Sequence, residues 1–146
     1  MNTTHNPPGQ RADDEHSPAV QRARAGADTW RHVVHAQRGA TPDHGDFYAL
    51  AGEMVDTLRC LDSLAGVLVG QVAGYRAAPR GETGREVYDD EGGNPADRLR
   101  AAVLALIETR DELSQAERAA NRFFSAIGHI GVRHPAQDDS QGGGRS

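Results

Sequence analysis

Three histidines near the N-terminus form the clearest metal-binding pattern of the chain. His32 and His35 lie three residues apart in the segment Trp-Arg-His-Val-Val-His, and His44 follows. On a helix this spacing puts two imidazoles on one side, but zinc needs a third or fourth ligand of defined geometry. The chain has one cysteine, Cys60, and no His-Glu-x-x-His run. The sequence therefore predicts neither a metal site nor a bound cofactor.

An acidic run after residue 88 is the second candidate for ligand chemistry. Its sequence, Asp89-Asp90-Glu91-Gly92-Gly93-Asn94, superficially suggests a calcium loop. It lacks ligands alternating at positions one, three and five, and it lacks the closing glutamate of an EF-hand. The composition indicates an acidic flexible linker over residues 77–94 instead.

Residue types that could catalyse a reaction are spread along helical patterns rather than grouped. Cys60 has Asp56 nearby but no histidine at helical spacing, so a nucleophile is not indicated. The acidic residues between 108 and 117 do not form the inward Glu-x-x-His pairs of di-iron bundles. The sequence predicts a protein that is not an enzyme. An enzyme on a helical-bundle core remains an alternative, although only Thr109 is expected to point into the core.

Two long runs with apolar residues at alternating steps of three and four must form the framework. In the first, over residues 42–76, the apolar positions are Phe47, Ala51, Met54, Leu58, Leu61, Ala65, Leu68, Val72 and Tyr75. In the second, over residues 95–131, they are Leu99, Ala102, Leu106, Leu113, Ala116, Ala120, Phe123, Ile127 and Ile130, with Thr109 in the same series. Asn94 suits an N-cap, Pro95 suits the first helical position, and Gly131 suits a C-terminal stop.

These patterns predict an all-α fold built on an antiparallel two-helix, coiled-coil-like hairpin. Pairing residues whose numbers add to 174 places Leu61 near Leu113. It also sets a large side chain against a small one at four levels, for example Leu58 against Ala116. Such alternation lets a narrow seam pack closely without voids.

The ends of the chain are polar, and residues 1–40 and 132–146 are predicted to be largely disordered. Within the first segment a third helix over residues 18–38 is an alternative. Ser17-Pro18 resembles a helix start, and apolar residues around Trp30 again step by three and four. Gly26 interrupts this pattern, so an ordered helix and a disordered arm both remain open.

The charge of the chain and its lack of targeting signals bear on which functions and cellular locations are expected. The net charge is −5, and all 16 basic residues are arginine, as a GC-rich coding sequence would give. No face is clearly basic, which argues against nucleic-acid binding. The alternative is an accessory nucleic-acid-binding or regulatory protein whose contacts would come from Arg22, Arg24, Arg31 and Arg38. No signal peptide or membrane span is evident, so we expect a cytoplasmic protein.

Apolar residues beyond the predicted seam gather near the linker, where exposed patches usually mark interaction surfaces. The expected self-association surface consists of Leu64, Gly66, Val67, Val69, Gly70, Gly74, Val103, Leu104 and Ile107. We expect a homodimer or a complex with another helical protein. The alternative is that the segment around Trp30 folds back and covers this patch within one chain.

Residues 46–75 and 95–132 resemble a group of small helical-hairpin proteins of actinobacteria. The resemblance rests on the stretches Asp46-Phe47-Tyr48-Ala49-Leu50-Ala51-Gly52-Glu53 and Glu117-Arg118-Ala119-Ala120-Asn121-Arg122-Phe123-Phe124-Ser125-Ala126-Ile127-Gly128-His129-Ile130. It implies a helical hairpin without an established activity, similar to accessory proteins of plasmids and integrative elements. Our leading expectation is therefore a non-catalytic helical interaction or scaffold module that self-associates through the linker end.

Overall fold

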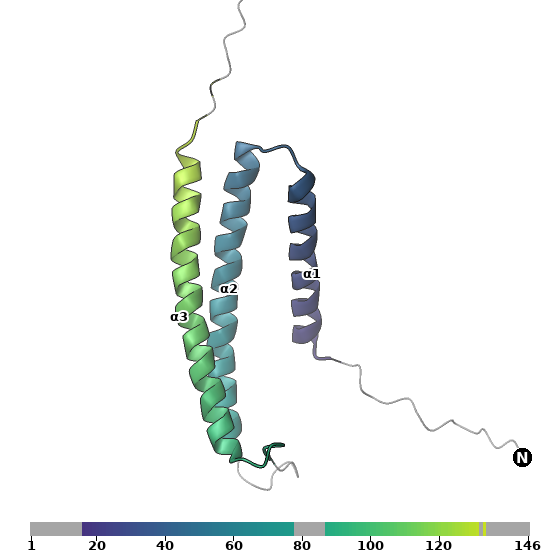
Figure 1. Ribbon diagram of the computed structural model, residues 1–146, viewed down its shortest axis with the longest axis vertical. Coiled ribbons are helices and arrows are strands. Elements are labelled where there is room, and N and C mark those ends of the chain that lie inside the picture. The colour runs from purple at the N-terminus through teal and green to yellow at the C-terminus, as the bar shows by residue number, and fades with distance from the viewer. Residues whose placement is uncertain (1–15, 78–86, 132, 134–146) are drawn as a thin grey trace, which may run out of the picture. The chain divides into compact units, whose positions relative to one another are not determined.

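The computed structural model describes residues 16–77, 87–131 and 133, and this part of the protein contains three helices (Figure 1). The described residues contain no strand, so the predicted all-α class is confirmed. The disorder predicted for residues 1–15, 78–86, 132 and 134–146 lies outside the described residues. The chain divides into two units, Met1–Thr41 and Pro42–Ser146, and each is described by itself.

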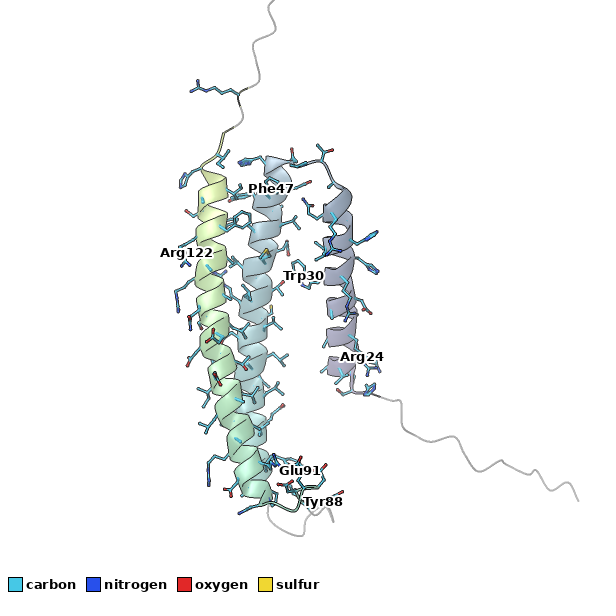
Figure 2. All side chains as sticks on the ribbon, in the orientation of Figure 1. Arg24, Trp30, Phe47, Tyr88, Glu91 and Arg122 are labelled. Carbon is cyan, nitrogen blue, oxygen red and sulfur yellow. The ribbon has the colours of Figure 1, made fainter. Side chains whose placement is uncertain are left out.

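The first unit contains helix α1, Pro18–Gly39. Ser17 caps it by accepting a hydrogen bond from the amide of Val20, and Pro18 takes the first helical position. Trp30, labelled in Figure 2, is half-buried, whereas most other α1 side chains are exposed. The structure thus has a helix over the segment for which the sequence left both a helix and a disordered arm open.

The second unit contains α2, His44–Ala77, and α3, Pro95–Gly128. At the start of α2 the Asp43 carboxylate accepts the amide N–H of Asp46 at 3.2 Å. At the start of α3 the Asn94 side chain accepts the amide N–H of Ala96 at 2.9 Å, and Pro95 follows. The Asn94-Pro95 start therefore works as a side-chain cap, which satisfies amides that have no partner within the helix.

The start of α2 lies beside the end of α3 (Figure 1). His44 donates from Nε2 to the carbonyl oxygen of Ile130 at 2.6 Å, just after the helix ends. α3 stops at Gly128, three residues before the Gly131 stop expected from sequence. A Cβ at residue 128 would lie 3.1 Å from the Tyr48 ring, so glycine permits the close approach of the two helices at this end.

Buried residues and side-chain contacts between α2 and α3 follow a heptad seam that differs from the predicted one at every second position; Tyr48 and Arg110 are exposed and belong to it through their contacts. The seam residues of α2 are Tyr48, Ala51, Val55, Leu58, Asp62, Ala65, Val69 and Val72. Those of α3 are Leu99, Val103, Leu106, Arg110, Leu113, Glu117, Ala120, Phe124 and Ile127. The most deeply buried seam residues are Ala51, Val55, Ala65 and Ala120. The core of this unit is consequently narrow and made mainly of small side chains.

Half of the predicted stripe was wrong because contacts between the helices turn each helix slightly about its axis. Met54, Leu61 and Phe123, predicted to lie in the seam, are 43%, 44% and 43% exposed. The next residues along the chain replace them: Asp62, for example, takes the seam position and pairs with Arg110. A pattern that counts only apolar residues passes over such charged seam positions.

Replacing Val55 by alanine is expected to lower the free energy of unfolding by about 1–3 kcal/mol, because the side chain is 4% exposed and its loss leaves a void. The matched change Val67→Ala, at a valine of the same helix that is 55% exposed, should stay within about 0.5 kcal/mol. Urea unfolding followed by circular dichroism measures both. Equal losses at the two positions would contradict the seam described above.

Candidate interaction surface

Two ion pairs cross between α2 and α3 at the middle of the helices. Arg110 donates from Nε and Nη2 to the two carboxylate oxygens of Asp62, at 3.0 and 3.2 Å. Arg59 donates from Nε to Glu117 at 2.8 Å. The Arg110 guanidinium lies over α2 at Gly66, where a Cβ would stand at an ordinary contact distance of 3.5 Å from the guanidinium carbon. The paired contacts of Asp62 fix orientation as well as distance.

The guanidinium of Arg110 holds the pKa of Asp62 below its ordinary value of 3.8. The hydrogen bond from Arg110 is the largest cause, and partial burial of the carboxylate opposes it. The same contact raises the pKa of Arg110. Because both groups stay partly open to water, they contribute to pairing geometry more than to the free energy of unfolding.

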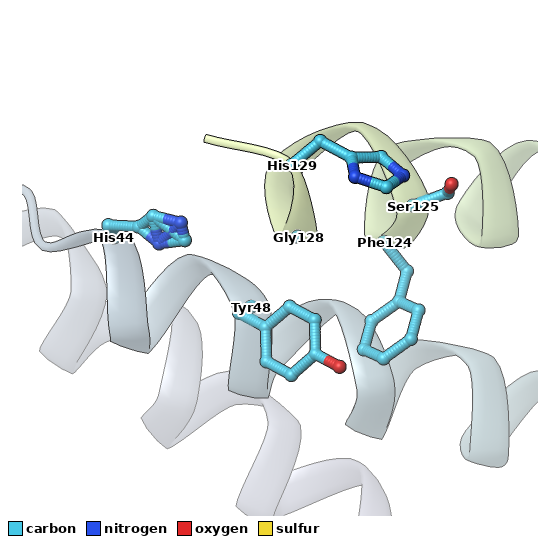
Figure 3. Close-up of a pocket in the computed structure, with 6 residues that line it drawn as sticks. All are labelled: His44, Tyr48, Phe124, Ser125, Gly128 and His129. Atoms are coloured by element: carbon cyan, nitrogen blue, oxygen red, sulfur yellow. The ribbon is translucent and has the colours of Figure 1, made fainter. Parts of the chain in front are cut away.

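A shallow hollow lies at the end of the unit where α2 begins and α3 ends (Figure 3). Its lining residues are His44, Tyr48, Phe124, Ser125, Gly128 and His129. The rings of Tyr48 and Phe124 stack with centroids 4.4 Å apart, and His44 is engaged with the carbonyl of Ile130. The groups at the floor of this hollow therefore hold the two helices together, and the hollow itself is open to solvent.

The acidic run before α3 forms a local cap rather than a solvated linker. The Asp89 carboxylate accepts the amide N–H of Glu91 at 3.0 Å and the Arg98 Nε–H at 3.0 Å. These contacts lower the pKa of Asp89, with the amide of Glu91 as the largest cause. Glu91 also pairs with Arg98. The carboxylates are thus occupied in fixing the turn that leads into α3.

The other residues singled out for chemistry stay apart. His32 and His35 are exposed on α1, and Cys60 is exposed on α2. Among the described residues, no three His, Cys, Asp or Glu side chains gather as a metal site would require. The arginines proposed for nucleic-acid contact, Arg22, Arg24, Arg31 and Arg38, are exposed along α1, where Arg31 pairs with Asp28.

The residues of the expected self-association surface are distributed around the two helices. Val69 and Val103 are half-buried seam residues, and Gly66 lies against Arg110. Leu64, Val67, Leu104 and Ile107 are exposed, and nothing lies within 4 Å of a Cβ at Gly70 or Gly74. Leu104 and Ile107 follow seam positions by one residue, whereas Leu64 precedes one, so their positions around the helices differ.

An uncharged stripe runs along the whole of α2 beside its seam. Its residues, here called the large outer stripe, are Phe47, Leu50, Met54, Thr57, Leu61, Leu64, Leu68, Gln71 and Tyr75. Those from Phe47 to Gln71 each precede a seam residue by one, which gives a second heptad series of the same length. Met54, Leu61, Leu64 and Tyr75 are exposed. A helix with two such series normally lies between two neighbours.

The corresponding positions of α3, which also precede seam residues, carry mostly alanine. This small outer stripe consists of Ala102, Ala105, Thr109, Glu112, Ala116, Ala119, Phe123 and Ala126. All of these residues are exposed, and the hydroxyl of Thr109 donates to the carbonyl of Ala105. By contrast, the positions that follow seam residues include the charged side chains Asp56, Arg59, Arg100, Asp111 and Arg118. Most charged residues beside the seam thus lie on one flank, although the exposed Leu104 and Ile107 share that flank near the linker and Glu112 lies in the small outer stripe.

The sequence-based prediction placed Leu64 in an exposed surface but assigned Met54, Leu61 and Phe123 to the core. The signal that could have separated them is the absence of charge in a second heptad series along α2. No helix in the described part of the chain carries an apolar stretch that could span a membrane. Comparisons with protein-family models, with characterised proteins and with solved structures find no match.

Replacing Asp62 by asparagine is expected to lower the melting temperature at pH 7, because Arg110 loses its charged partner. A lowered pKa means that the Asp62 carboxylate stabilises the fold above its ordinary pKa, and that this contribution is lost as the pH falls through the lowered value. The difference between D62N and the natural chain should therefore shrink below about pH 3.8.

The matched control is Asp56→Asn. The side chain of Asp56 is 72% exposed and that of Asp62 is 29% exposed, and Asp56 pairs only with Arg59 of its own helix. Melting curves recorded by circular dichroism between pH 2 and 7 should show little effect of D56N. A D62N difference that persists unchanged at the lowest pH would rule out the ion pair as its cause.

Proposed function

We propose that this protein is a non-catalytic helical interaction module that self-associates through the apolar surface left open on α2. In this proposal residues 42–131 act as an antiparallel, coiled-coil-like hairpin. The large outer stripe then belongs to an interface between molecules. The exposed residues near the linker, including Leu64 and Val67, form its linker end.

The contacts between the helices support the antiparallel pairing. The pairs His44–Ile130, Tyr48–Phe124, Arg59–Glu117 and Asp62–Arg110 have residue numbers that add to between 172 and 176. These sums stay close to the 174 expected from sequence, and a constant sum is the mark of helices running in opposite directions. With this pairing, positions that precede seam residues on both helices fall on one face of the hairpin.

One observation carries the proposal: the large outer stripe has no charged residue from Phe47 to Tyr75, yet Met54, Leu61 and Leu64 are 43–47% exposed. Exposed apolar patches of this extent usually mark interaction surfaces. The seam between α2 and α3 buries mainly alanine and valine, so one hairpin alone has a small core. Covering the stripe with another helical surface would supply the missing burial.

Light scattering on a sizing column tests self-association directly. The full chain is expected at a multiple of 15.6 kDa, twice that mass for a dimer. The double variant L61E/L64E should elute as a monomer, because burying two carboxylates in an apolar interface is costly.

The control is Ser63→Glu, which adds one carboxylate at an exposed position of the same turn on the charged flank. It should leave the mass unchanged. A natural chain that stays at 15.6 kDa over a wide concentration range would refute self-association, and equal effects of S63E and L61E/L64E would refute this surface.

A further inference from the structure

We infer that the surface which covers the large outer stripe is the small outer stripe of a second copy of this chain. Two hairpins would then stack face to face, with α2 of each copy against α3 of its partner, as a four-helix bundle. The two-fold axis would run parallel to the helices. This inference rests on the proposed function. It adds which surface covers the large outer stripe and in which orientation the two copies pack.

Complementary side-chain size carries the inference. When two hairpins stack about such an axis, residues at the same height meet, and contacts within one chain show that residues at the same height have numbers adding to about 172–176. On the two outer stripes, Phe47 then faces Ala126, Met54 faces Ala119 and Leu68 faces Ala105 of the partner copy. Leu50 opposite Phe123 and Leu61 opposite Glu112 are the exceptions. A large residue against a small one at most levels gives an even spacing between helices without voids.

The opposite orientation about a perpendicular axis fits these residues less well. It would set α2 against α2, with Phe47 opposite Tyr75 and Leu61 opposite its own copy. On α3 the same axis would set Glu112 against its own copy and Ala119 against Ala105. One pair of helices would be held apart while the other approached closely, and such uneven spacing packs poorly around a single core.

Charged residues at the margin of the interface also agree with the inferred orientation. Glu53 and Arg122 each stand one residue before an outer-stripe residue, Met54 and Phe123. In the inferred arrangement Glu53 of one copy lies at the level of Arg122 of the other. Neither side chain makes an ion pair within the described residues of one chain. Opposite charges at flanking positions of this kind favour one partner and one orientation.

The area is sufficient for a stable complex. α2 and α3 have 34 residues each, so each is roughly 50 Å long at about 1.5 Å per residue. With helix axes about 8–10 Å apart, one face of the pair offers roughly 900 Å². Stable interfaces use about 800 Å² per partner.

Disulfide trapping tests both the occupant and the orientation. In a Cys60→Ser background, two single variants, Leu61→Cys and Glu112→Cys, are unfolded in urea, mixed, refolded together and oxidised. The mixture should give a disulfide-linked dimer containing one chain of each variant. Each variant alone should give none, because in the inferred bundle its two cysteines lie on diagonal helices, beyond the about 7 Å between Cα atoms that a disulfide can bridge.

Two other outcomes overturn the inference. Cross-linking of each variant alone would mean that α2 meets α2, which refutes the orientation but keeps self-association. A mixture without cross-links refutes the small outer stripe of a second copy as the surface that covers the large outer stripe. The mass from light scattering then decides whether the protein self-associates at all. A multimeric mass would leave the proposed function standing on another surface, whereas a monomeric mass would refute both.

The control pair is Ser63→Cys mixed with Ser114→Cys, two positions that follow seam residues on the charged flank. Neither the mixture nor the single variants should cross-link if the large outer stripe is the contact surface. Cross-links between these cysteines would contradict the inference, because they would bring the charged flanks together.

Discussion

The apolar surface of α2 is more than one neighbouring helix can cover, and this constraint governs the rest of the structure. A helix meets one neighbour along a single stripe, and α3 occupies that stripe. From Ser63 to Tyr75 α2 carries no charged residue on any side. The shared core holds mainly small side chains, which bring the two backbones close together but remove little apolar area from water. Close pairing of α2 with α3 and an uncovered outer stripe therefore have the same origin.

The ion pair between Asp62 and Arg110 gives the seam its register. A slide of one heptad would set Asp62 beside Val103 or beside Glu117, without a partner in the first case and against a like charge in the second. Apolar residues alone would tolerate such a slide, because alanine and leucine recur at similar spacings along both helices. The two opposite charges thus set the axial position of the helices, which the small residues of the seam leave free.

Helix boundaries and the class of fold could be predicted because they depend on local chemistry. Asn94 and Pro95 begin α3 through contacts within a few residues, and the steps of three and four hold over the full length of both helices. The rotation of each helix could not be predicted, because it depends on pairs such as Tyr48 with Phe124, which are distant in sequence. An error of one residue was enough to put Met54 in the core in place of Val55. The same error displaced the predicted self-association surface, because that surface was defined by the apolar residues outside the predicted seam.

The hydrogen bond from His44 to Ile130 joins the two ends of the second unit at one point in space. The segments that continue from Pro42 and from Gly131 are accordingly tethered within a short distance of each other. In a bundle whose axis runs along the helices, the partner copy would add its own two tethers at that same end. Four attached segments would then start from a small volume, and any weak binding motif among them would act at a raised local concentration. Self-association would in that case make the protein multivalent, so that several contacts of low affinity act together as one attachment of high avidity.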